Sequence, residues 1–293
     1  MAMLAAMLMF VSSDTLVKIV SADFPPAQMM AVRGVFAAAF ALGLVVLSGQ
    51  GGRLSGAFAP RVLARSSIEA AVCFLFFTSL AQLPIATITT IGQAAPIILT
   101  LMAVALGIER VGWRPWGAIL VGFGGVLLVV RPSPAGLNLY AIIALASAAL
   151  VAARDLVTRF IPTAIPSTVV TFSTTVTVAL AGFVLGATEE WRPVLRVQTL
   201  YLAASAVLVT FGSLGIIVAF RGSDVAVVGP FRYSIVVLAI LIGYVVFGEW
   251  PDGLAVAGTA LITASGIYTL HHDQARRRKA LSAPAALDRA KAA

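Results

Sequence analysis

Long apolar runs follow one another along almost the whole 293-residue chain. A helix needs about 20 apolar residues to cross a bilayer, and ten runs of roughly that length lie between prolines, glycines and short polar stretches. They cover residues 1–20, 27–48, 67–83, 85–107, 113–130, 137–157, 167–187, 197–219, 225–247 and 253–270. Only 11% of the residues are charged, which is too few to cover the surface of a soluble domain of this size. The sequence therefore predicts an all-α integral membrane protein with ten transmembrane helices.

The positions of the cations predict how these helices are oriented. With the N-terminus in the cytoplasm, 14 of the 20 Lys and Arg residues lie in cytoplasmic segments and four lie outside. Such an excess is typical of cytoplasmic loops in membrane proteins. The net charge of +8 therefore indicates topology and contact with membrane lipid, and no nucleic acid partner. We expect both termini in the cytoplasm, with 272–293 as a basic tail. The 17 Arg against three Lys indicate a GC-rich bacterial genome, and we expect the protein in a bacterial inner membrane.

The second half of the chain repeats the first at a spacing of 141 residues. Asp14, Lys18 and Pro25 recur as Asp155, Arg159 and Pro166, and Gly107, Gly117 and Gly125 recur as Gly248, Gly258 and Gly266. Residues 1–132 and 137–271 are then two five-helix repeats. Because five is an odd number, the second repeat enters the membrane from the opposite side. This arrangement predicts an inverted pair that gives alternating access to a site near the midplane.

Two motifs resemble a known family. The apolar run from Pro96 to Glu109 and the segments Pro230-Phe-Arg-Tyr233 and Phe247-Gly-Glu249 are similar to the Gly-Glu-ending helices of the drug/metabolite transporter superfamily, in its ten-helix form with two EamA-type halves. Ile108 splits the Gly-Glu pair of the first half. Within the superfamily the chain looks most similar to bacterial amino acid exporters, including the aromatic group. The resemblance implies a substrate cavity near the membrane centre, lined by helices from both halves.

Arg232 and Tyr233 are the first candidates for substrate binding. Arg232 lies about 10 Å into its predicted helix at 1.5 Å per residue, where a cation faces a cavity or a partner more readily than lipid. It can bind a substrate carboxylate, or it can extend to the interface or pair with Asp224. Tyr233 offers a ring and a hydroxyl to an amphipathic ligand. Arg33 lies nearer its helix end, so we expect it to extend towards the interface.

Gln93, Thr90 and Phe77 are weaker candidates for the substrate site. The first two offer hydrogen bonds at the membrane centre, which can equally join two helices. Phe77 belongs to an aromatic cluster that can line a cavity or fill the core. Gly182 with Gly186, and the three glycines Gly122, Gly124 and Gly125, predict close helix packing.

Asp14, Asp155 and Arg154 are candidates for proton coupling or gating, because carboxylates inside a membrane are often functional. The acids precede Lys18 and Arg159 by four residues, so each pair can also be a simple stabilising contact on one helix face. Pro84, Pro96 and Pro230 can kink or hinge their helices.

The expected function is export of amino acids, including aromatic ones, by a monomer that uses alternating access. The sequence predicts no cofactor, no metal site and no enzyme activity, because it has no nucleotide-binding loop and its two histidines, His271 and His272, lie together near the tail. Other substrates stay open: a nucleoside, a lipophilic cation or a sugar phosphate. A different class, a receptor or scaffold without transport, gives no reason for an inverted repeat.

Overall fold

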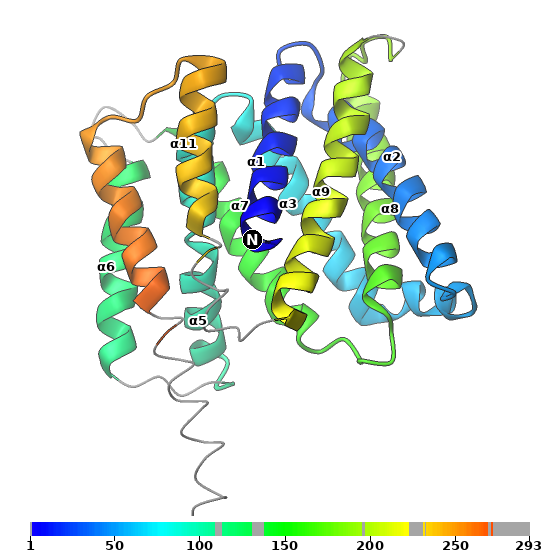
Figure 1. Ribbon diagram of the computed structural model, residues 1–293, viewed down its shortest axis with the longest axis horizontal. Coiled ribbons are helices and arrows are strands. Elements are labelled where there is room, and N and C mark those ends of the chain that lie inside the picture. The colour runs from blue at the N-terminus through cyan, green and yellow to red at the C-terminus, as the bar shows by residue number, and fades with distance from the viewer. Residues whose placement is uncertain are drawn as a thin grey trace, which may run out of the picture.

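The computed structural model describes residues 2–108, 113–130, 138–194, 197–222, 231, 233–268 and 271. This part of the chain is helical and contains no strand (Figure 1). The α-helices are α1 (Ala2–Val20), α2 (Pro26–Leu47), α3 (Pro60–Leu80), α4 (Ile85–Gly92), α5 (Ala95–Ala105), α6 (Trp113–Val130), α7 (Leu139–Thr158), α8 (Ser167–Leu185), α9 (Val197–Gly222) and α11 (Ser234–Phe247). Two 3₁₀ helices, η1 (Gly51–Phe58) and η2 (Gly186–Thr188), lie between them. A last apolar helix covers Gly253–Tyr268.

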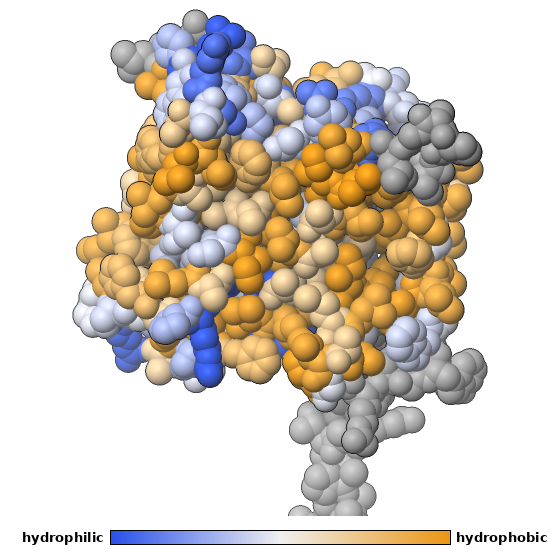
Figure 2. Space-filling view, turned by 180° about the vertical axis from the view of Figure 1, so that it is seen from behind, coloured by the Kyte–Doolittle hydropathy of each residue, from blue (hydrophilic) through white to orange (hydrophobic). Residues whose placement is uncertain are grey.

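Six of the described helices are long and apolar enough to cross a membrane. They are Met3–Val20, Pro26–Leu47, Pro60–Leu80, Ile85–Ala105, Leu139–Thr158 and Ser167–Thr188. Four shorter apolar helices are Ile119–Val130, Val197–Ser213, Ser234–Phe247 and Gly253–Tyr268. Figure 2 shows apolar side chains across the middle of one face and hydrophilic ones at its upper and lower margins. The all-α membrane fold is thus confirmed, while the count of ten spans stays a prediction.

Two predicted runs differ from the structure. α3 begins at Pro60, seven residues before the predicted start, because proline at the first helical position has a backbone angle suited to starting a helix. The run 85–107 is divided into α4 and α5 just before Pro96. Proline has no N–H for the helical bond to the carbonyl four residues earlier. Gln93 and Ala94 instead donate to the carbonyls of Thr90 and Ile91, each at 3.0 Å.

The most extensive helix contacts occur in related pairs. α2 packs along α8, α1 along α9, and α3 along α7. In Figure 1, α2, α8 and α9 lie together on one side of the molecule. At a spacing of 141 residues, α1, α2 and α3 overlap α7, α8 and α9. The contact between α1 and α9 therefore corresponds to that between α7 and α3.

Close helix crossings depend on glycines, as predicted for Gly182. A Cβ atom placed on Gly182 would lie 2.4 Å from the backbone nitrogen of Ala31, and one on Gly34 would lie 2.8 Å from the Cα of Ala179. α2 and α8 therefore approach each other at backbone distance. A Cβ atom placed on Gly125 would likewise lie 2.8 Å from the carbonyl oxygen of Gly258. Gly124 faces open space, so the prediction of close packing is wrong for that residue.

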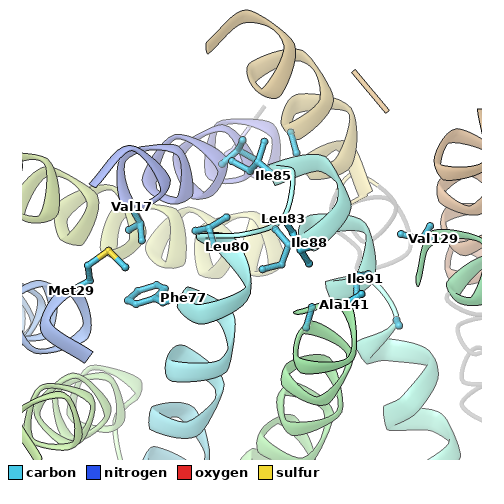
Figure 3. Close-up of a cluster of buried hydrophobic side chains, with 14 of the residues drawn as sticks. Val17, Met29, Phe77, Leu80, Leu83, Ile85, Ile88, Ile91, Val129 and Ala141 are labelled. Atoms are coloured by element: carbon cyan, nitrogen blue, oxygen red, sulfur yellow. The ribbon is translucent and has the colours of Figure 1, made fainter. Parts of the chain in front are cut away.

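The main hydrophobic core joins both halves of the chain. It includes Phe77 and Leu80 of α3, Val17 of α1 and Met29 of α2, all at most 2% exposed. Figure 3 shows the ring of Phe77 and the side chain of Met29 close to each other at one end of this cluster. The core thus closes one end of the space between α2 and α3, where the candidate site begins.

Candidate functional site

A cavity of about 200 Å³ lies between α2, α3, α8 and α9. Its walls are formed by Met30, Arg33, Gly34, Ala37, Arg65, Glu69, Cys73, Phe77, Thr171, Thr174, Thr175, Val178, Val209, Thr210 and Ser213. The lining residues of each helix recur at intervals of three or four, which places them on one helix face. The cavity is therefore built from one face of each of four packed helices.

The two opposing walls follow the spacing of 141 residues. α2 contributes Met30, Arg33, Gly34 and Ala37, and each has its counterpart in Thr171, Thr174, Thr175 and Val178 of α8. Glu69 of α3 and Thr210 of α9 are related in the same way. The walls nevertheless differ in chemistry, since residues before position 132 supply the charges and residues after 137 supply the hydroxyls.

Arg33 is the cation best placed to bind a ligand. Its Nη2 donates to Ser13 Oγ at 3.0 Å, and its guanidinium lies 5.3 Å from the centre of the Phe77 ring. The Nε atom is buried and has no hydrogen-bond partner among the described residues. Asp14 interacts with Arg33 electrostatically. A buried donor without a partner is costly. The Nε–H of Arg33 can therefore donate one hydrogen bond to an anionic or carbonyl oxygen of a ligand.

Glu69 carries the opposite charge in the same wall. Its Oε2 accepts from Arg154 Nη1 at 2.7 Å. Arg154 also donates to Asp155 Oδ1, through Nε at 2.9 Å and Nη2 at 2.7 Å. Arg65, one turn before Glu69, donates to Thr174 Oγ1 at 2.6 Å. These contacts join α3 to α7 and α8 beside the cavity.

The structure brings together only part of the predicted substrate site. Phe77 lines the cavity. Thr90 instead bonds Thr259 at 3.1 Å between their hydroxyls, as the alternative of helix joining predicts, and Gln93 lies at the turn between α4 and α5. The hydroxyl of Tyr233 lies against Gly266. Arg232 lies outside the described residues.

Arg33 and Glu69 are two charged residues among the cavity residues that the sequence reasoning missed. Arg33 was expected to extend to the interface, but it lines the cavity instead. It is the eighth residue of α2, about 10 Å from the helix start at 1.5 Å per residue. Arg33 therefore lies as deep in its helix as was predicted for Arg232, and the same reasoning would have placed it at a cavity. Glu69 had a signal too, because Arg65, Glu69, Cys73 and Phe77 recur every four residues.

The ion pair expected between Asp14 and Lys18 is replaced by another one. Lys18 pairs with Glu249 at 2.5 Å rather than with Asp14, and Asp155 pairs with Arg154. The Lys18 ammonium also donates to the Leu83 carbonyl at 2.8 Å, while Glu249 Oε2 accepts from the Ile85 N–H at 3.1 Å. Coupling or gating by Asp14, Asp155 or Arg154 stays a prediction.

Breaking the contact between Lys18 and Glu249 is expected to destabilise the protein. Their side chains are 11% and 26% exposed, so Glu249→Gln leaves a largely buried ammonium without its counter-ion. We expect a loss of roughly 3 kcal/mol, the lower end of the effect of breaking a buried pair. Thermal unfolding of the purified protein in detergent measures it. The double variant Lys18→Met with Glu249→Leu should lose less than either single variant, and additive losses would contradict a direct interaction.

The sequence and the fold are both similar to those of known proteins. The sequence profile of the EamA-like transporter family matches residues 1–131. These residues, which make up a little less than half of the chain, are similar to that family. The whole fold also has a solved counterpart, a crystal structure that covers 94% of this chain and 96% of its own at a TM-score of 0.64 and 21% identity.

Curated proteins similar to this chain are transporters of several small molecules. A riboflavin transporter of Rhizobium johnstonii is 28% identical over 74% of this chain and 70% of its own. A pseudopaline exporter of Pseudomonas aeruginosa is 28% identical over 87% and 89%. An S-adenosylmethionine uptake transporter of Rickettsia prowazekii is 24% identical over 65% of each chain. These three relatives transport different small molecules, and none of their names specifies an aromatic amino acid.

Proposed function

We propose that the chain exports amino acids across the bacterial inner membrane. The buried Nε of Arg33, which has no hydrogen-bond partner among the described residues, carries this proposal. Arginine binds a carboxylate through a planar pair of N–H groups. Phe77 lies next to this guanidinium and offers an apolar surface to a substrate side chain. The hydroxyls of Thr175 and Ser213 line the same cavity and can take further polar contacts.

Alternating access between two inverted halves is the proposed mechanism. The paired helix contacts support it, because α1–α9 and α7–α3 are related by the spacing of 141 residues. The glycine turns after α5 and α11 support it as well. Gly107 and Gly248, which are 141 positions apart, have φ angles of 68° and 67°. The cavity lies between helices of both halves of one chain, so a monomer is sufficient for the cycle. We place both termini in the cytoplasm.

Export is the proposed direction, supported by the pseudopaline exporter, whose match covers most of both chains. Cells that make the protein and are fed an amino acid as a dipeptide should release the free amino acid faster than cells without it. Release at equal rates would contradict export.

Counterflow in proteoliposomes tests the substrate class. Vesicles loaded with unlabelled phenylalanine or leucine should accumulate the labelled amino acid, and protein-free vesicles should not. Riboflavin, S-adenosylmethionine and a nucleoside serve as the comparison ligands. Exchange of one of these without any amino acid exchange would make the substrate assignment wrong and leave the transporter class in place.

A further inference from the structure

Glu69 is the one acidic side chain among the lining residues of the cavity. Its side chain is 20% exposed, and its carboxylate is bound by Arg154 of α7, which is not itself a lining residue. Glu69 is thus paired with a cation that does not itself line the cavity.

Asp155 is a second partner of Arg154, and it keeps Arg154 paired when Glu69 binds another group. Its Nε and Nη2 both donate to Asp155 Oδ1, while Nη1 alone donates to Glu69. When another cation takes Glu69, Arg154 therefore stays paired with Asp155. The exchange replaces one cation with another at Glu69, so no buried carboxylate is left uncompensated.

The charges around the cavity also fit a ligand with two opposite charges. Arg33, Arg65 and Arg154 are balanced by Asp14, Glu69 and Asp155. An anion at Arg33 alone would disturb this balance. A ligand that brings an anion to Arg33 and a cation to Glu69 leaves it unchanged.

We propose that Glu69 binds an ammonium group of the substrate and that Arg154 competes with the substrate for it. This inference deepens the proposed function, since it adds the site for the amino group of an amino acid. Arg154 acts as an internal substitute ligand, which keeps Glu69 paired while the cavity is empty. It is a positioning residue whose strength of binding to Glu69 sets the affinity for the ammonium group.

Binding of 2-phenylethylamine tests this without relying on amino acid transport, because this amine has an ammonium group and no carboxylate. Calorimetric titration of the purified protein in detergent gives its affinity. Arg154→Gln should bind the amine roughly tenfold more tightly than the unchanged protein, as expected for freeing a charged hydrogen-bonding group. Asp155→Asn should bind it more weakly, because Arg154 then depends on Glu69 alone. Glu69→Gln should bind it more weakly still.

Arg154→Gln and Asp155→Asn should change the affinity in opposite directions. This result separates the mechanism from misfolding, which lowers binding in every variant. Arg61→Ala is the matched control, since Arg61 lies on α3 outside the cavity and donates to the Phe160 carbonyl; its affinity for the amine should not change. Equal amine binding, or none, in all proteins would overturn the proposal. The expected pattern together with no amino acid counterflow would overturn the proposed substrate and keep Glu69 as a cation site.

Discussion

Arg33→Ala is expected to abolish measurable amino acid counterflow at low substrate concentration. The variant removes the guanidinium whose Nε has no partner among the described residues and which would bind the substrate carboxylate. Loss of a charged hydrogen bond costs about 1.5–3 kcal/mol, or roughly a 10- to 100-fold lower affinity. The affinity of the purified protein for phenylalanine and the initial rate of counterflow measure this loss.

Two further variants make the result specific to the geometry of Arg33. Arg33→Lys keeps the charge but loses the planar pair of donors, so its affinity should lie between those of the unchanged protein and Arg33→Ala. Arg53→Ala removes an exposed cation from η1 and should transport normally. Full activity of Arg33→Ala would make the proposed carboxylate site wrong.

Gly182→Val is expected to prevent α2 and α8 from packing as they do. The first side-chain atom would lie 2.4 Å from the nitrogen and 2.7 Å from the Cα of Ala31. These are backbone atoms, which cannot turn away as a flexible side chain does. Overpacking costs roughly 1–3 kcal/mol even between side chains, so we expect an apparent melting temperature that is lower by about 2–12 °C, or no folded protein. Size-exclusion chromatography and thermal unfolding in detergent measure this.

Gly43→Ala is the matched control on α2. No atom lies within 4 Å of a Cβ placed on Gly43, and alanine favours a helix by about 1 kcal/mol over glycine. This variant should be folded and at least as stable as the unchanged protein. A stable, active Gly182→Val would contradict the close approach of the two helices.

Helix positions were largely predictable, because the apolar runs and their proline and glycine breakers mark them directly. The run 167–187 begins at the first residue of α8. The start of α3 was not predictable by hydropathy, since its first turns carry Arg61, Arg65 and other polar residues. The division at Gln93 depends on Pro96, whose effect on a helix can be a kink or a break.

The candidate site was less predictable, because hydropathy cannot identify which face of a membrane helix meets another helix. Lipid and protein neighbours both accept apolar side chains, so periodicity is weak along α2 and α8. Phe77 was found through its aromatic neighbours. Arg33 was misplaced because a cation near a helix end can extend to the interface, and only the position of Ser13 and Phe77 around it indicates that it stays inside.

The unlike walls of the cavity have an evolutionary consequence. With the halves related as proposed, Arg33 corresponds to Thr174 and Glu69 to Thr210. A dimer of two identical half-length proteins must present the same residue on both sides of its symmetry axis, and would set arginine against arginine and glutamate against glutamate. Two repeats within one chain are free of that constraint, because each can change without the other. Such a chain can recognise a molecule whose two ends differ.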